Sequence, residues 1–254
     1  MIDTHCHLTD PRLASQVDDV LSRAAAAGVS HVLTIGTDPA DDRLCLEVCK
    51  GRPNVRCAVG VHPNNIADVP DAELESLRGI QADASVVALG EMGLDYHYGK
   101  ELRDRQIEFF EFQLRLATEV GKPVIIHCRE AAEDCLAVMR PFGKVRAVFH
   151  CFTGTVAEAV KILDRGYLLG FTGVVTFKNS GELRDVVKMT PADRLIVETD
   201  APYLSPEPMR KQKVNEPAFV MHTANVVAQL RGISTQQLDE LTTRNASAFF
   251  SWPM

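Results

Sequence analysis

The sequence lacks several features that would define a special class of protein. No apolar run approaches the length of a membrane-spanning helix, so we expect no membrane partner. The N-terminal residues show no basic segment followed by an apolar stretch, so no secretion signal is expected. The seven cysteines are an odd number and contain no Cys-x-x-Cys pair, which favours reduced thiols in a cytoplasmic protein.

Excess basic charge is also absent, because the formal net charge is −7. A protein that coats duplex DNA would usually be basic, so this balance argues against a structural nucleic-acid binder. It does not exclude an enzyme that holds one strand end at a locally positive, metal-loaded site. No Gly-x-Ser-x-Gly element is present, so no serine nucleophile is expected.

A glycine-rich turn is missing after the first apolar run, which ends at His7. Eight such runs alternate with helical patterns, at residues 2–7, 31–37, 55–61, 86–91, 123–128, 145–151, 167–172 and 194–200. This alternation allows an open doubly wound sheet or a closed barrel. An open sheet that binds a dinucleotide would need the missing glycines. The sequence therefore favours an α/β protein with a (β/α)8 TIM barrel, as a single domain over residues 1–254.

The segments between the runs carry helix signals. One apolar face is formed by residues spaced three and four apart, namely Ile107, Phe110, Leu114 and Ala117. Gly121 is placed to end that helix. Thr155 with Glu158, and Ser234 with Gln237, have the spacing of capping boxes, which predicts helix starts at both places.

Polar residues gather where the predicted strands end, which is where barrel enzymes carry their active sites. His5 and His7 are two apart on one strand, so both side chains point to the same side and can grip one ion. The other strand ends carry His62, Glu91, His127, His150 and Asp200. Four of the histidines with Glu91 and Asp200 would suffice for two metal ions. Such mixtures of imidazole and carboxylate suit zinc, manganese or cobalt better than magnesium.

Other histidines and cysteines have plainer interpretations. His31 begins a strand and His222 lies in a helical pattern, so both are expected to be structural. His97 follows Glu91 in a loop and can face the site. Cys6 and two further cysteines, Cys128 and Cys151, each follow a strand-end histidine, and we expect them to be small buried apolar residues.

Taken together, these motifs resemble those of the TatD-type metal-dependent deoxyribonucleases, within the amidohydrolase-like barrels. The matching stretches appear in the family's order and span nearly the whole chain, at residues 3–7, 60–63, 90–96, 127–129, 150–154, 198–204 and 215–217. The resemblance implies a TIM barrel with a divalent-metal site.

By analogy with the family, His5 and His7 would hold one metal with Asp200. His127 and His150 would hold the second, and Glu91 would bridge the pair. Many binuclear members of the wider superfamily use a modified lysine as the bridge. Glu91 stands at the equivalent strand end, so we predict no such modification.

Two ions about 4 Å apart can share a water and lower its pKa toward neutrality, which makes hydroxide the nucleophile. Asp200 would then act as ligand and general base, and Glu91 would complete the catalytic centre. Arg129 and the basic cluster around Lys211 can hold phosphate oxygens. His62 is expected to contact phosphate or to donate a proton to the leaving group. Asn215 is expected to cap a helix that starts near Pro217.

The leading hypothesis is a nuclease that attacks single-stranded DNA from an end, with two divalent ions (Mg, Mn or Zn). The chemistry supports hydrolysis, and only the resemblance supplies DNA. An alternative is a hydrolase of a small amide, ester or lactone, or an aminoacyl-tRNA-type deacylase, with the same metals. A non-catalytic metal-binding or partner-binding protein is a third hypothesis, and the complete ligand set argues against it. A cytoplasmic monomer is the default expectation.

Overall fold

A computed structural model describes residues 1–252, so the last two residues of the predicted domain lie outside the described part. The chain forms two compact units. The terminal unit comprises Met1–Thr34 and Cys151–Met254, and the central unit comprises Ile35–His150. The single-domain organisation over residues 1–254 stays a prediction.

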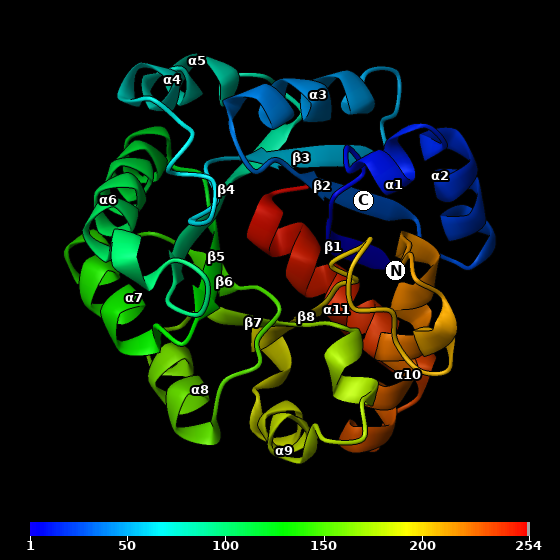
Figure 1. The fold of residues 1–254 in the computed structure, drawn as a ribbon. Helices are drawn as coiled ribbons and strands as arrows, with labels where there is room; N and C mark the ends of the chain where they lie inside the picture. Colours follow the sequence, from blue (N-terminus) through cyan, green and yellow to red (C-terminus); the bar gives the residue numbers. More distant parts are fainter. Residues whose placement is uncertain (253–254) are drawn as a thin grey trace. The chain divides into compact units, whose positions relative to one another are not determined.

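The central unit contains four parallel strands, β3 (Val55–Val59), β4 (Val86–Asp95), β5 (Val124–Arg129) and β6 (Ala147–Phe149), paired in that order. Its helices are α3 (Pro39–Cys49), α4 (Asp71–Glu75), α5 (Leu77–Ile80), α6 (Arg103–Val120) and α7 (Ala132–Met139). Within this unit α3 packs on β3, α6 on β4, and α7 on β4 and β5 (Figure 1).

The terminal unit contains β1 (Ile2–Cys6), β2 (His31–Ile35, with Ile35 across the unit boundary), β7 (Leu168–Phe171) and β8 (Leu195–Val197). β1 pairs with β2 and β7 with β8, all parallel. A parallel bridge between Cys6 and Ala201 extends the contact of β1 with the end of β8. Its helices are α1 (Pro11–Ala14), α2 (Val17–Ala26), α8 (Val156–Leu163), α9 (Gly181–Met189), α10 (Val220–Arg231) and α11 (Thr235–Phe250).

The eight strands follow one another in chain order from β1 to β8, with helices between them. This is the topology of the predicted (β/α)8 barrel. The prediction that the strands are buried on both faces is confirmed, because consecutive residues such as Ile125 and Ile126 in β5, or Ile196 and Val197 in β8, are all buried. Each such side chain contributes about 1.5–3 kcal/mol by leaving water.

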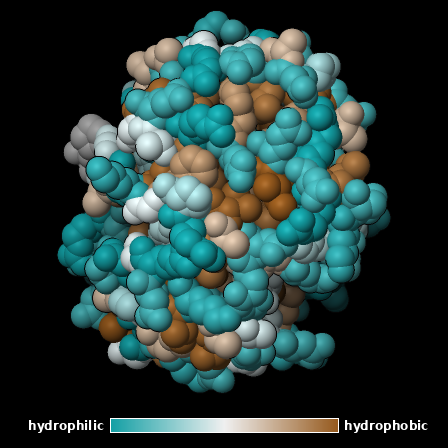
Figure 2. Space-filling model, turned by 90° about the vertical axis from the view of Figure 1, so that its left-hand side faces the viewer, coloured by the Kyte–Doolittle hydropathy of each residue, from teal (hydrophilic) through white to brown (hydrophobic). Residues whose placement is uncertain are grey.

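The helix signals are confirmed as well. Phe110, Leu114 and Ala117 are buried on α6, Ile107 is half-buried, and Gly121 ends that helix in the left-handed conformation (φ 72°). Thr155 and Ser234 make complete capping boxes at the starts of α8 and α11. No helix within residues 1–252 combines the length and the apolar character needed to cross a membrane. Hydrophilic residues predominate on the face that Figure 2 shows.

Three expectations need correction. Strand β4 continues past Glu91 to Asp95, because its pairing with β5 runs on through Met92 and Leu94. Cys6 is buried as predicted, but Cys128 and Cys151 keep some exposure, so the prediction of burial is wrong for those two. Asn215, considered below, makes no helix cap. His31 packs edge-on against Trp252 with ring centroids 4.9 Å apart, which agrees with a structural role.

Candidate metal centre

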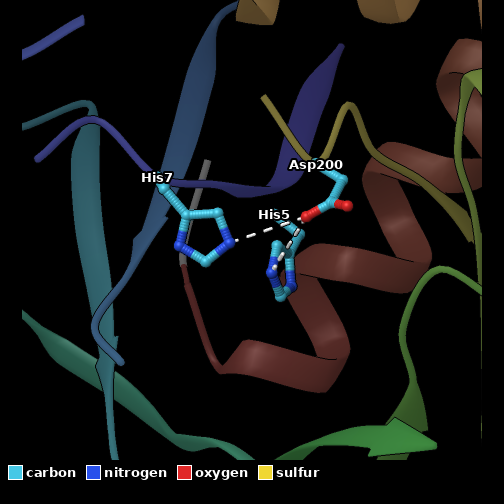
Figure 3. Close-up of side chains that lie close together, drawn as sticks. All are labelled: His5, His7 and Asp200. Atoms are coloured by element: carbon cyan, nitrogen blue, oxygen red, sulfur yellow. Dashed lines mark ion pairs between the residues drawn. The ribbon is translucent and has the colours of Figure 1, made fainter. Parts of the chain in front are cut away.

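A first metal-ligand cluster lies in the terminal unit and consists of His5, His7 and Asp200. His5 is in β1, His7 follows that strand, and Asp200 follows β8. Figure 3 shows both rings beside the Asp200 carboxylate, with Oδ1 lying 3.7 Å from His5 Nε2 and 3.5 Å from His7 Nε2. One ligand atom of each residue lies within 4.8 Å of the others. Two imidazoles and a carboxylate at this spacing fit a divalent cation.

The position of Asp200 is fixed by hydrogen bonds between the first and last strands. Its backbone N–H donates to the His5 carbonyl at 2.8 Å, and the His7 N–H donates to the Ala201 carbonyl at 2.7 Å. The Asp200 backbone is left-handed (φ 57°), a conformation that is uncommon for non-glycine residues but is adopted more readily by Asp than by most. These bonds join segments more than 190 residues apart in the sequence and bring the three ligands together.

Asp3 is a buried carboxylate in β1, the strand that carries His5. It accepts hydrogen bonds from Thr199, at 2.8 Å from the backbone N–H and 2.6 Å from Oγ1. Burial raises the pKa of Asp3 to about 8, and the hydrogen bonds from Thr199 and His5 offset part of that rise. Asp3 thereby holds the residue that precedes Asp200.

Asn215 acts on the same segment. Its side-chain NH₂ donates to the Thr199 carbonyl at 3.0 Å and to the Tyr203 carbonyl at 2.6 Å. The helical turn near Pro217 has no side-chain cap, so the expected capping role of Asn215 is wrong. The amide of Asn215 is used instead to hold the loop that carries Asp200.

A second metal-ligand cluster lies in the central unit and consists of His62, Glu91, His127 and His150, at the ends of β3 and β6 and within β4 and β5. Glu91 Oε1 lies 2.5 Å from His150 Nε2, 2.9 Å from His127 Nδ1 and 3.6 Å from His62 Nε2. His62 Nε2 is 3.2 Å from His127 Nδ1. Three imidazoles around one buried carboxylate are again donors for a zinc-like divalent ion.

Asp95 supports this second cluster from the far side of His127. Its Oδ2 lies 3.0 Å from His127 Nε2, which leaves Nδ1 facing Glu91. Burial opposes the charged form of His127, but the hydrogen bonds to Asp95 and Glu91 outweigh it and raise the pKa to about 10. Burial likewise opposes the charged form of Asp95, yet the hydrogen bonds from His127 and Tyr98 keep the Asp95 pKa below its usual value. The site thus favours positive charge, as a metal site should.

Buried polar side chains on the covering helices hold the loop that carries His62. Asp42 of α3 accepts from the Gly60 N–H at 3.1 Å. Gln113 of α6 accepts from the Val61 N–H at 2.8 Å and donates to the Val61 carbonyl at 3.1 Å. The backbone of Gly60 and Val61, which directly precede His62, is therefore held by these side chains.

Gln106 does the same for the end of β4. It accepts from the Asp95 N–H at 2.8 Å and donates to the carbonyls of Asp95 and Gly99 at 3.0 and 2.8 Å. These supporting glutamines were not predicted, although the sequence held a signal. Gln106 and Gln113 fall on the apolar face of α6, and a polar residue on a buried face must have a partner.

The remaining predicted residues have different surroundings. His62, expected to contact the substrate, lies among the ligands of the second cluster. Arg129 ends β5, and its guanidinium packs over the Tyr98 ring at 4.6 Å. Lys211 is exposed in η5 (Met209–Lys211), and its phosphate contact stays a prediction. His97 is exposed and its Nδ1 lies 2.8 Å from Glu130, so it belongs to neither cluster.

Comparison with known proteins places this chain among metal-dependent hydrolases. Residues 2–251 match the family described as TatD related DNase. The uncharacterized metal-dependent hydrolase YcfH of Escherichia coli K12 is 42% identical over 256 residues, which cover 98% of this chain and 95% of YcfH. The 3'-5' ssDNA/RNA exonuclease TatD of Erwinia amylovora is 37% identical, with 98% and 99% of the two chains covered.

A solved structure of a TatD homologue has the same fold as this chain. YJJV, a TatD homologue from Escherichia coli K12, superimposes with a TM-score of 0.95 at 28% identity, over 100% of this chain and 98% of that chain. The match confirms the predicted (β/α)8 barrel class. The chain belongs to the TatD related DNase family of metal-dependent hydrolases.

Proposed function

We propose that the protein is an exonuclease that hydrolyses phosphodiester bonds at an end of single-stranded DNA. The observation that carries the proposal is the pair of histidine and carboxylate clusters at the strand ends. Relatives named as 3'-5' exonucleases acting on single-stranded DNA and RNA support the choice of substrate.

His5, His7 and Asp200 would hold one divalent cation, and His127, His150 and Glu91 would hold the second, with His62 available as a further ligand. Because both sets are rich in imidazole, we favour zinc or manganese over magnesium. When bound, such cations lower the pKa of water and neutralise charge on a phosphate. The bridging role of Glu91 stays a prediction. Its test is the number of metal ions bound per chain by a Glu91→Gln variant. Loss of both ions supports the bridge, and loss of only one contradicts it.

Asp200 is the group proposed to take the proton from the attacking water. Its carboxylate is partly exposed, and the hydrogen bonds around Thr199 and Asn215 hold it in place. Arg129 supplies fixed positive charge for substrate phosphates from the exposed end of β5. Deprotonation of the attacking water is thus assigned to Asp200, and phosphate binding to Arg129.

The test is cleavage of end-labelled single-stranded DNA by protein stripped of metal and reloaded separately with magnesium, manganese or zinc. Asp200→Asn should abolish the metal-dependent ladder of products. Asp104→Asn makes the same chemical change at a side chain that is 96% exposed and should leave the ladder intact. No cleavage by protein that holds two ions would overturn the nuclease proposal and favour a carboxylic ester or amide substrate.

A further inference from the structure

Few large apolar side chains are exposed in the described part of the chain. They are Leu44, Tyr98, Val160, Met189 and Tyr203. Tyr98 is 64% exposed and Tyr203 is 47% exposed. Tyr203 donates a hydrogen bond to a ligand of the first cluster, and Tyr98 donates one to Asp95, which supports the second cluster. Each of the two tyrosines has an arginine packed on its ring.

Tyr203 lies next to the first cluster. Its N–H donates to the carbonyl of the ligand Asp200 at 2.9 Å, and its ring lies edge-on to His7 with centroids 6.2 Å apart. The Arg12 guanidinium packs over the ring with Cζ 4.4 Å from the centroid. Asp10 holds that guanidinium through two hydrogen bonds of 2.8 and 2.7 Å. The ring and its cation are therefore fixed next to the ligands.

Tyr98 has the equivalent arrangement at the second cluster. Its N–H donates at 2.9 Å to Asp95 Oδ1, while Oδ2 of the same carboxylate faces the ligand His127. The Arg129 guanidinium lies over the Tyr98 ring with Cζ 4.6 Å from the centroid. His97 packs edge-on against the ring at 4.6 Å. One carboxylate thus positions both a metal ligand and an exposed aromatic ring.

An exposed ring with a fixed cation is suited to single-stranded nucleic acid. Every base offers a π-face that can stack on a tyrosine, and the neighbouring guanidinium can bind a phosphate. We propose that Tyr98 with Arg129 in the central unit, and Tyr203 with Arg12 in the terminal unit, are each a stacking site for a nucleobase of the single-stranded substrate. This inference rests on the proposed nuclease function.

The test compares substrates with and without bases. Tyr98→Ala and Tyr203→Ala should each raise KM for oligothymidylate by about 5- to 100-fold, the range expected for one lost stacking contact. Both variants should retain wild-type rates on an oligomer of the same length with abasic residues and on bis(4-nitrophenyl) phosphate. Tyr→Phe at either position keeps the ring and should keep the wild-type KM. Leu44→Ala removes an exposed apolar side chain from α3 and serves as the control.

Two results would overturn the inference. One is an unchanged KM for oligothymidylate in both alanine variants. The other is an equal loss on the abasic oligomer, which would show a general defect instead of lost stacking. A wild-type protein that cleaves none of these phosphodiesters overturns the proposed function instead. In that case the affinity for labelled oligothymidylate, measured by fluorescence anisotropy, still tests the stacking sites. Equal affinities of the wild type and both alanine variants refute them.

Discussion

Asp95 and His127 form a carboxylate–imidazole pair in which Asp95 Oδ2 lies 3.0 Å from His127 Nε2. The pair fixes the ring so that Nδ1 faces Glu91 at 2.9 Å. Metal-bound histidines commonly give their second nitrogen to a carboxylate, which fixes the tautomer and makes the ligating nitrogen more basic. Asp95 is therefore expected to act on a metal through His127.

Replacing Asp95 with Asn should weaken metal binding at the second cluster by about 10- to 100-fold, the usual effect of losing such a support. Competition with a fluorescent chelator measures the affinity. The exposed Asp104→Asn variant should bind metal like the wild type. Equal affinities for Asp95→Asn and the wild type would show that the pair does not position the ligand.

Metal binding at the second cluster should release a proton near pH 7. The pKa of His127 is raised to about 10, so the metal-free ring is protonated below that pH and a cation must displace the proton. Lowering the pH strengthens the proton's competition and weakens binding, by about tenfold per pH unit for one proton. Calorimetry in buffers of different ionisation enthalpy measures the release. A binding enthalpy that is the same in every buffer would contradict this prediction.

Thr199→Val should destabilise the metal-free protein by about 1–3 kcal/mol, because the buried Asp3 loses the hydroxyl that lies 2.6 Å from it. Activity should fall too, since Thr199 precedes Asp200. Thr199→Ser keeps the hydroxyl and should restore most of both properties. Urea unfolding of the metal-free variants gives the free energy of unfolding. Similar free energies of unfolding for the Val and Ser variants would show that the hydroxyl does not carry the effect.

Asp42→Asn should make stability less dependent on pH. Burial raises the pKa of Asp42 well above its ordinary 3.8. The contribution of this carboxyl to the free energy of unfolding is therefore fully present below the pKa of the unfolded chain. It is lost as the pH rises toward the pKa of the folded protein. Asparagine can still accept from Gly60 but does not titrate. The free energy of unfolding of Asp42→Asn, relative to the wild type, should therefore be higher at pH 8 than at pH 5, by up to about 1.4 kcal/mol per pH unit. A constant difference at both pH values would refute this assignment.

The strand ends and most ligand candidates could be predicted because their signals are local. His5 lies in β1 with His7 just after that strand, and Asp200 follows β8. The predicted range of strand β4, 86–91, is too short because Glu91 resembles a polar residue at a strand end, whereas pairing with β5 extends β4 to Asp95. Local pattern cannot show which neighbour a strand will have.

The supporting residues depend on contacts between distant segments. Local pattern could mark Gln106 and Gln113 as polar residues on a buried helix face, but it could not name their partners. The distance between His62 and His127, residues 65 apart, makes His62 a ligand candidate instead of a substrate contact alone. Asn215 was predicted as a cap because an Asn before a Pro is typical of helix starts. Its partners, the carbonyls of Thr199 and Tyr203, are known only once the loop is folded.

The two clusters differ in when the ribosome can complete them. Every ligand of the second cluster has been synthesised once His150 has been added, and its supports Asp42, Asp95 and Gln113 precede it. The first cluster pairs the earliest residues with Asp200, and the bond from Thr199 to Asp3 spans 196 residues. The first cluster can therefore form only after the end of β8 has been synthesised, whereas all residues of the second cluster precede β7.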